Sequence, residues 1–337
     1  MAIGRFTRST LAPVSLGLGL LALALPPQAF AQDALAPRDR KGSDPPAARI
    51  DDRRIRESSG LARSSREPGL FWTHNDSGDG PELFAFDTQG KVTGSCRLRG
   101  IDPVDWEDMA PLAQDGVNRL IVADVGDNNA KRKTVTLVFF DEPDPRGQSD
   151  VADYHVITLR YPDGPRDCEA VMVDSISGVV TLVSKTFLPG ATIHTCELPP
   201  RKPGRVIDDT PRELRRVGGL PLSLVTGIDH DPQSGDVLVI NYFQLFRFPK
   251  PRDDRPWWLQ SPRPADLPRF KQIEAVAADA DGSAWVTSEG TPAPFGKVNE
   301  SASPPQGNTP PATNRYSLAA VLVRRTPHPA PRAPARP

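Results

Sequence analysis

Apolar and polar residues alternate in short runs through most of this chain, in a pattern typical of β-strands. Between about residue 55 and residue 290 the same order of features recurs five times. Each unit begins with an acidic residue or a threonine and a short strand of small apolar residues, then turns into a strongly apolar strand that ends in polar residues. The five units start at Glu57, Glu107, Glu169, Thr226 and Glu274.

The spacing of roughly 50 to 60 residues leaves room for four short antiparallel strands in each unit, and repeats of this length favour a β-propeller. Glycine ends each turn between the first and second strands, at residues 66–69, 114–116, 175–178, 232–235 and 279–282, which is ordinary hairpin chemistry. Helical periodicity of any length is absent. The sequence therefore predicts an all-β fold: a β-propeller with five recognisable repeats, five or six blades, and four antiparallel strands in each blade.

The two ends of the chain differ from the repeats. Arg5 and Arg8, the apolar run 11–25 and the small residues Ala29 and Ala31 have the layout of a cleavable signal peptide, residues 1–31. A membrane anchor is disfavoured because the run is shorter than the ~20 residues of a span. We expect an exported protein, periplasmic or extracellular, with no transmembrane segment after cleavage.

Residues 32–54 are charged and rich in proline, which predicts a flexible leader before a propeller domain at 55–325. Residues 291–314 are rich in proline, serine and asparagine, and we expect them to form a surface loop without a central strand. The apolar stretch 316–324 is a predicted strand that finishes the last blade. Residues 326–337 are a predicted disordered, proline-rich tail.

Composition and charge limit the kinds of binding partner that the sequence predicts. The formal net charge is −1 and the arginines are scattered along the chain, so nothing indicates nucleic-acid binding, and we expect a monomer. The three cysteines, Cys96, Cys168 and Cys196, allow at most one disulfide within the chain. We interpret them mainly as small buried apolar residues.

In a propeller the first strand of every blade lines the central channel. The predicted first strands therefore bring five acids, Glu57, Glu107, Glu169, Asp229 and Glu274, to one mouth of the channel. Carboxylates at close range repel one another unless a cation compensates, and Ca²⁺ prefers oxygen ligands. The predicted calcium ligands are Glu57, Asn75, Asp76, Asp124, Asp127, Asn128 and Asp229.

Two other interpretations of these polar residues stay open. The acids can accept hydrogen bonds from backbone amides of the neighbouring blade, and Asp or Asn after a strand is an ordinary turn residue.

Zinc is disfavoured because only His74 and His230 lie near the predicted face. The pair Trp257 and Trp258 is either an exposed surface for a partner or a cap on a blade edge.

Leading nucleophile and nucleotide motifs are missing from the sequence, including a Gly-x-Ser-x-Gly elbow and a phosphate-binding loop. Any hydrolytic chemistry then depends on the metal and an acid. Glu107 or Glu169 is the predicted general base toward water. His74 and Glu274 are predicted to contact the substrate, and Lys185 is predicted either to bind an anionic group of the substrate or to neutralise the ring of acids.

Five short motifs carry a resemblance to a known group. They are residues 57–62 (ESSGLA), 74–78 (HNDSG), 105–108 (DWED), 124–128 (DVGDN) and 273–277 (IEAVA). Over residues 55–290 the chain resembles secreted bacterial β-propellers of the phytase-like and esterase-like group, and it is distantly similar to gluconolactonase and senescence-marker propellers. The basic clusters of a true phytase are not evident.

The gluconolactonase likeness implies a divalent ion at the channel mouth that polarises a lactone carbonyl or activates water. Glu57 is then a ligand, together with Asn75, Asp127 or Asn128, and Asp229. The leading hypothesis is a calcium-dependent hydrolase of a small ester or lactone. The alternative is a non-enzymatic, metal-stabilised binding or scaffold protein of the cell envelope, since a fold does not choose between the two.

Overall fold

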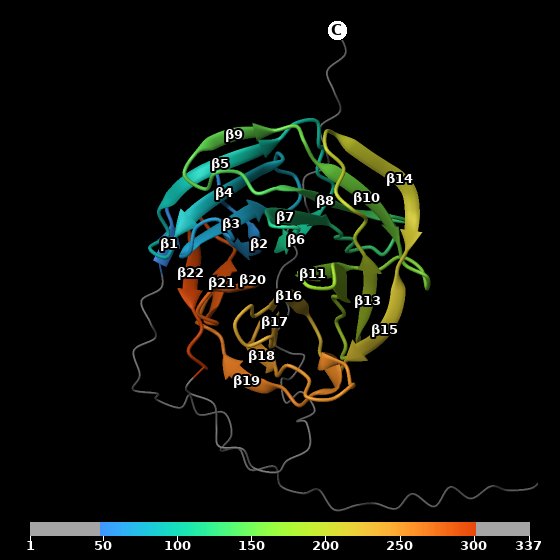
Figure 1. Cartoon of the computed structure of the whole chain (residues 1–337). Helices are drawn as coiled ribbons and strands as arrows, with labels where there is room; N and C mark the ends of the chain where they lie inside the picture. The colour runs from blue at the N-terminus through green and yellow to red at the C-terminus, as the bar shows by residue number, and fades with distance from the viewer. Residues whose placement is uncertain (1–47, 301–337) are drawn as a thin grey trace, which may run out of the picture. The chain divides into compact units, whose positions relative to one another are not determined.

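The five predicted first strands are all present in the computed structural model, which describes residues 48–300, and they surround one axis (Figure 1). Each contacts the next along the chain, and the fifth contacts the first, so the ring is closed. These inner strands are β2 (Ser58–Arg63), β6 (Trp106–Gln114), β11 (Cys168–Asp174), β16 (Val225–His230) and β20 (Ile273–Ala278). The described residues thus form five blades, numbered I to V in this order.

Each blade continues outward through three further antiparallel strands. The second strands are β3 (Leu70–Asn75), β7 (Val117–Asp124), β12 (Val179–Ser184), β17 (Val237–Asn241) and β21 (Ala284–Ser288). The third are β4 (Glu82–Asp87), β8 (Val135–Asp141), β13 (Ala191–Glu197), β18 (Gln244–Phe248) and β22 (Ala293–Lys297). The fourth are β5 (Val92–Leu98), β10 (His155–Arg160), β15 (Arg215–Leu220), β19 (Arg263–Asp266) and β1 (Ala48–Ile50). The prediction of an all-β propeller is confirmed; within residues 48–299 the one helical element is the 3₁₀ turn η2 (Trp257–Leu259).

The predicted turns between first and second strands adopt the backbone that glycine favours. The glycine that ends each turn has a positive φ, for example 73° at Gly116 and 69° at Gly178. A residue with a Cβ is disfavoured in this region. The repeated glycine therefore sets the hairpin that joins each inner strand to its partner.

Strand β1 closes the ring by pairing antiparallel with β22, so the two ends of the described chain share blade V. Both strands correct our expectations. Residues 48–54 belong to the fold although we predicted a leader to residue 54, and Ile50 is fully buried. β22 lies inside the predicted loop 291–314; it tolerates Pro294 because its ladder to β21 begins one residue later, at Phe295.

Several expectations fall outside the described residues. These are the signal peptide 1–31, the first part of the leader, the strand 316–324 and the tail 326–337. Among residues 48–300, no helix has the length and apolar character needed to cross a membrane.

Two blades carry a fifth strand supplied by the next blade. β9 (Gln148–Val151) runs parallel to β5 of blade I, and β14 (Val206–Glu213) runs parallel to β10 of blade II. Each comes from the connection between the third and fourth strands of the following blade. These connections cover sheet edges that would otherwise present unpaired backbone groups.

The connection in blade IV repeats this arrangement with η2 instead of a strand, because η2 contacts β15 of blade III. The indole of Trp258 lies so close to Gly218 that a Cβ there would be 2.4 Å from Nε1. Trp257 packs edge-on against Phe248 at 5.3 Å. The tryptophan pair therefore caps a blade edge, which was one of its two interpretations.

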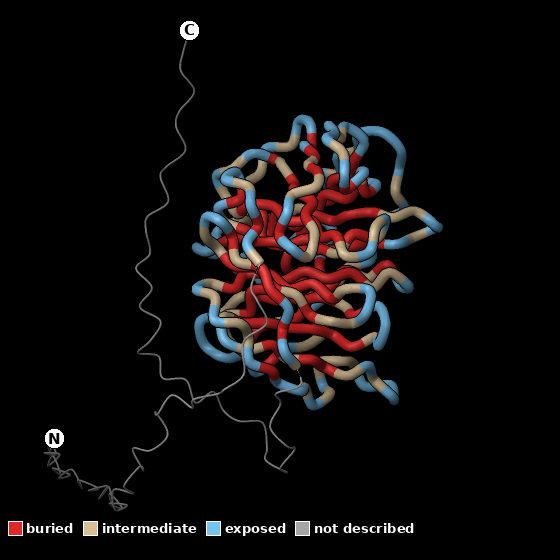
Figure 2. Tube along the Cα trace, turned by 90° about the vertical axis from the view of Figure 1, so that its left-hand side faces the viewer, coloured by how far each residue is buried: buried red, intermediate tan, exposed pale blue. Residues whose placement is uncertain are grey.

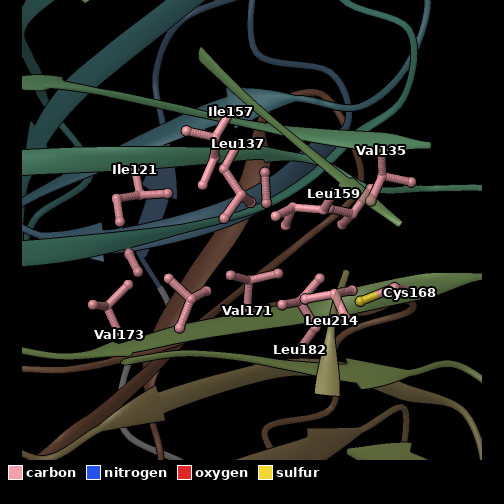
Figure 3. Packing of buried hydrophobic residues seen from close by; sticks show 14 of the residues in the cluster. Ile121, Val135, Leu137, Ile157, Leu159, Cys168, Val171, Val173, Leu182 and Leu214 are labelled. Carbon is pink, nitrogen blue, oxygen red and sulfur yellow. The ribbon is translucent and has the colours of Figure 1, made fainter. Parts of the chain in front are cut away.

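The core lies between neighbouring blades, where apolar side chains of facing sheets interdigitate. Figure 2 shows the buried segments at the centre of the sheets and the exposed segments mainly in the connections. In Figure 3, Ile121, Leu137 and Ile157 of blade II face Val171 and Leu182 of blade III. Cys96 and Cys168 are buried and Cys196 is half-buried, and all three are free thiols.

Candidate metal centre at the channel mouth

Each inner strand carries a β-bulge near its first residue, and the bulge sets the mouth of the channel. The ladder to the second strand skips one residue in every blade. These residues are Ser59, Glu107, Glu169, Thr226 and Glu274. A bulge leaves its extra residue out of the ladder and redirects the side chain, so three predicted acids of the ring share one structural position.

The other two acids of the predicted ring lie elsewhere. Glu57 precedes the bulge of blade I by two residues, and Asp229 follows the bulge of blade IV by three. Ser59 and Thr226 occupy the equivalent positions, and each hydroxyl donates to the next blade: to the carbonyl of Glu107 at 2.9 Å and of Ile273 at 3.0 Å. Spacing in the sequence did not reveal this register because it does not show where a bulge falls.

Two further positions repeat at the same end of the blades. Two residues before the bulge stand Glu57, Asp105 and Asp167 in blades I to III. Directly after the second strand stand Asp76, Val125, Lys185, Tyr242 and Glu289. The mouth therefore collects polar side chains from up to three positions of a blade, and blades I to III supply most of the acids.

Carboxylates from three blades converge on Glu107. Asp76, Asp105 and Glu107 each offer an oxygen within 4.8 Å of the others, and Glu107, Asp167 and Glu169 form a second such group. Glu107 belongs to both groups. Glu107 and Glu169 are buried, whereas Asp76, Asp105 and Asp167 are half-buried. The two groups together are the acid cluster.

Gly126 lets the backbone approach this cluster. A Cβ on Gly126 would lie 2.2 Å from Oε1 of Glu107 and 2.5 Å from Cγ of Asp105. Its amide donates to the carbonyl of Asp105 at 3.2 Å. Only glycine fits here without moving both acids, so the segment after β7 shapes the site.

Lys185, Tyr242 and Glu274 form the other side of the mouth, the Lys–Tyr–Glu group. The ammonium of Lys185 bonds Glu169 and donates to the hydroxyl of Tyr242 at 2.8 Å. The same ammonium lies 5.1 Å from the centre of the Tyr242 ring. Lys185 here neutralises one of the buried acids, which is one of the two roles predicted for it.

The acids of the cluster have raised pKa values, because their ionised forms are disfavoured in the mouth. Burial, with the charge of Glu169 next in importance, raises the pKa of Glu107 well above its usual value. Burial also raises the pKa of Glu169 well above its usual value, against the opposing effect of Lys185. Burial and the charge of Asp76 raise the pKa of Asp105 to about 6.

Glu274 and Lys185 are coupled across the mouth. Burial raises the pKa of Glu274 to about 7, although the ammonium of Lys185 and a hydrogen bond from Tyr242 act in the other direction. Burial alone would lower the pKa of Lys185, but the charges of Glu169 and Glu274 raise it well above its usual value. Lys185 therefore remains a cation at neutral pH.

Asn75 and Asp124, two predicted metal ligands, end their second strands and bond the backbone that leads into the inner strand. The Oδ1 of Asn75 accepts from the amides of Arg56 and Glu57 at 2.9 and 3.2 Å. Asp124 accepts from the amides of Val104 and Asp105 and from Arg132 at 2.6 Å. This use is the alternative that the sequence left open.

Three other predicted ligands are also placed outside the acid cluster. Asp127 accepts from the amides of Lys131 and Arg132 within its own turn, and Asn128 is exposed. The buried carboxylate of Asp229 accepts from the amides of His230 at 2.7 Å and Ala278 at 2.8 Å. Asp76 is the one predicted ligand that the structure brings into the cluster.

His74, a predicted substrate contact, is fully buried beneath the mouth. Burial lowers its pKa to about 4, its Nδ1 lies 2.9 Å from the carbonyl of Asn75, and its ring packs edge-on against Trp106. Its other nitrogen faces Gly60, where a Cβ would lie 2.3 Å away. A substrate at the mouth has no path to this side chain, so its role is packing.

Asp167, Tyr242 and Gly126 belong to the mouth but escaped sequence reasoning. One signal was available: Asp167 precedes Glu169 by two residues, as Asp105 precedes Glu107. This repeated acid-x-Glu pattern marks the same place in two blades.

The comparisons with known proteins add little to this geometry. No protein-family profile matches the chain, and no curated protein matches it in sequence. Solved structures do match, among them a glucose dehydrogenase with a TM-score of 0.44 and 10% identity, over 76% of this chain and 99% of that one. So distant a likeness carries no argument about activity.

Proposed function

We propose that the acid cluster binds a divalent cation, calcium, and that the protein hydrolyses a small ester or lactone beside it. The observation that carries the proposal is the pair of carboxylate groups, Asp76–Asp105–Glu107 and Glu107–Asp167–Glu169, which share Glu107. The donors would be Asp76, Asp105 and Glu107, with Asp167 and Glu169 on the other side of Glu107.

The donor chemistry fits calcium. All five groups are carboxylates, and Ca²⁺ takes oxygen ligands and accepts irregular geometry. Burial and mutual repulsion disfavour ionisation of Glu107 and Asp105, and a bound cation reverses that balance. A bound ion would therefore offset an electrostatic cost that is built into the mouth.

A bound calcium ion would act as a Lewis acid toward a carbonyl oxygen. The chain itself supplies the proton chemistry. Glu274, with its pKa of about 7, suits a general base that takes a proton from water near neutral pH. The Tyr242 hydroxyl and the Lys185 ammonium are donors for the oxygen on which negative charge develops.

This assignment differs from the roles we predicted from the sequence. Glu169 is held by Lys185, and Glu107 is the acid shared by both carboxylate groups, so both fit metal binding better than proton transfer. The resemblance to exported phytase-like and esterase-like propellers agrees with a calcium-dependent hydrolase. As part of the proposal we place the protein outside the cytoplasm, in accord with the signal-like residues 1–31.

A second function is favoured by two specific observations. Lys185 already neutralises part of the acid charge, and the hydrogen bonds of Asn75 and Asp124 brace the inner strands. In a metal-stabilised binding or scaffold protein of the cell envelope, the same groups would only hold the ring together.

Thermal unfolding tests the metal site first. The protein would be purified from residue 32, stripped of metal, and melted with and without calcium, with magnesium as the comparison ion. A ligand at a hundredfold excess over its Kd stabilises the native state by about 2.7 kcal/mol. Absence of both a shift and bound metal would contradict the proposal.

Activity then separates the two functions. Calcium-loaded protein would be screened against short-chain esters and small lactones. Turnover that is lost in Glu274→Gln while the calcium-induced shift remains supports the hydrolase. A calcium-induced shift without turnover on any ester or lactone supports the scaffold instead.

A further inference from the structure

A pocket of about 380 Å³ lies in blade V. Its lining includes Glu289 and Gly290, which follow β21 directly, and the amide of Glu289 donates to the carbonyl of Gln272, two residues before Glu274. Glu289 occupies the same blade position as Asp76, Lys185 and Tyr242, and its charge contributes to the raised pKa of Glu274. The pocket therefore adjoins the side of the mouth to which we assign the general base.

The polar lining of this pocket is mainly cationic, unlike that of the mouth. Arg49, Arg269 and Lys271 line it and are exposed, and Glu289 is the one acid among its lining residues. Arg49 donates to the carbonyl of Pro292 at 3.2 Å. Among residues 48–300, none of these three cations forms an ion pair with a carboxylate of that range.

The rest of the lining is apolar. Phe270 comes from the connection between β19 and β20, and Pro292 and Pro294 come from the start of β22. A ligand that fits both surfaces has a short carbon skeleton and a negative charge. The pocket thus has three cationic side chains and one acid, and its apolar surfaces can contact a few carbon atoms of a ligand.

We propose that this pocket binds a carboxylate group of the substrate, so that the substrate is an ester or lactone with a second, non-reacting carboxylate. This inference rests on the proposed function, whose substrate class it narrows. Arginine presents a planar fork of donors that matches a carboxylate. One carboxylate group brings a single negative charge near Glu289, whereas a phosphate dianion would concentrate two charges on one group there.

Succinate is a suitable probe because it has two carboxylates on a short carbon chain. It would be titrated into metal-free protein from which the chelator has been dialysed, since a chelator carries carboxylates of its own. We expect saturable binding that weakens with salt. Arg269→Ala combined with Lys271→Ala should weaken it about tenfold or more, because two charge-assisted contacts are lost.

Lys297→Ala is the matched control, since Lys297 is an exposed lysine of β22 outside the pocket lining. Succinate affinity should be unchanged in this variant. No saturable binding, or equal losses in the control and the double variant, would overturn the inference. Inorganic phosphate that binds more tightly than succinate would overturn the assignment to a carboxylate.

The calcium-induced shift in melting temperature keeps this test separate from the proposed function. The double variant should retain the shift, because its two side chains lie outside the acid cluster. Succinate binding without any calcium effect would support the pocket and contradict the proposed function. A calcium effect without succinate binding would contradict the pocket alone.

Discussion

Glu107 is the central residue of the acid cluster. It is the bulge residue of blade II, it lies in both carboxylate groups, and it is buried. Gly126 and Ser59 contact it from two sides. A buried acid with neighbours of its own charge is costly without a cation, so its ionisation should report on the metal.

Glu107→Gln should abolish most of the calcium-induced rise in melting temperature, because the shared donor loses its charge. The metal-free variant should be at least as stable as the metal-free wild type, since a buried group with a strongly raised pKa has been neutralised. Thermal unfolding with and without calcium measures both effects. Glu197→Gln, at an exposed acid of β13, is the control, and an undiminished calcium response in Glu107→Gln would count against the proposed ligand set.

The pH dependence of stability follows from the raised pKa of Glu274, about 7 against 4.5 in the unfolded chain. Between these values the folded protein holds more protons than the unfolded chain. The free energy of unfolding of metal-free protein should therefore fall as pH rises, by up to about 1.4 kcal/mol per pH unit for one such group, and level off above the folded pKa.

Comparing urea unfolding of the wild type and of Glu274→Gln between pH 6.5 and 8 separates this effect from those of Glu107 and Glu169, whose pKa values are also raised. Below that range His74 and His194 act in the opposite direction, because burial lowers the pKa of each to about 4. Glu274→Gln should flatten the fall, and calcium should reduce it in the wild type. Stability that rises with pH in metal-free wild type would show that Glu274 ionises freely in the folded protein.

At the scale of elements, the repeated unit is an inner strand braced at its start by the polar residue that ends the second strand. Asn75 and Asp124 bond the amides that precede their inner strands, and Ser288 accepts from the amide of Gln272 at 3.3 Å. These contacts place the bulge, and the bulge places the acids. Asn75 and Asp124, which we predicted as metal ligands, thus position the acids through their hydrogen bonds to the backbone.

Asn75→Ala should lower the free energy of unfolding by about 1–3 kcal/mol, because the amides of Arg56 and Glu57 lose their acceptor. Urea unfolding measures the change. Asn128→Ala is the control: Asn128 is exposed, and the expected change is within about 0.5 kcal/mol. If Asn75→Ala leaves stability intact but removes the calcium response, Asn75 is a ligand, as the sequence resemblance implied.

At the scale of the whole molecule, the ring depends on a contact between the two ends of the described chain. β1 pairs with β22 and buries Ile50 against Phe71, Phe86 and Phe295 in one cluster. Without β1, the edge of β22 would be open and blade V would have three strands. An exposed edge invites pairing with other chains.

A chain that starts at residue 55 should therefore be much less stable than one that starts at residue 48. Loss of Ile50 alone corresponds to a buried-isoleucine truncation of about 2–5 kcal/mol, and the strand pairing is lost with it. Melting temperature and light scattering compare the two chains, with the chain from residue 32 as reference. Equal stability of both truncated chains would mean that β1 does not close the ring in solution.

The sequence by itself determined the class of fold, the five inner strands and the turns that follow them. Alternation along a strand and glycine at a turn with positive φ are local properties, so they can be recognised without knowing which strands pack together. It also identified three buried acids, Glu107, Glu169 and Glu274, because their position repeats from blade to blade.

Only the tertiary structure decided which groups surround those acids. A bulge shifts the register by one residue, so Ser59 rather than Glu57 occupies the ring position of blade I. Whether a polar side chain is free to bind a metal or is held by the protein depends on its hydrogen-bond partners. Those partners come from other blades or from residues far along the chain, as with Lys185 and Tyr242. The short outer strands β1 and β22 form because ring closure brings them together, a long-range contact that no local pattern encodes.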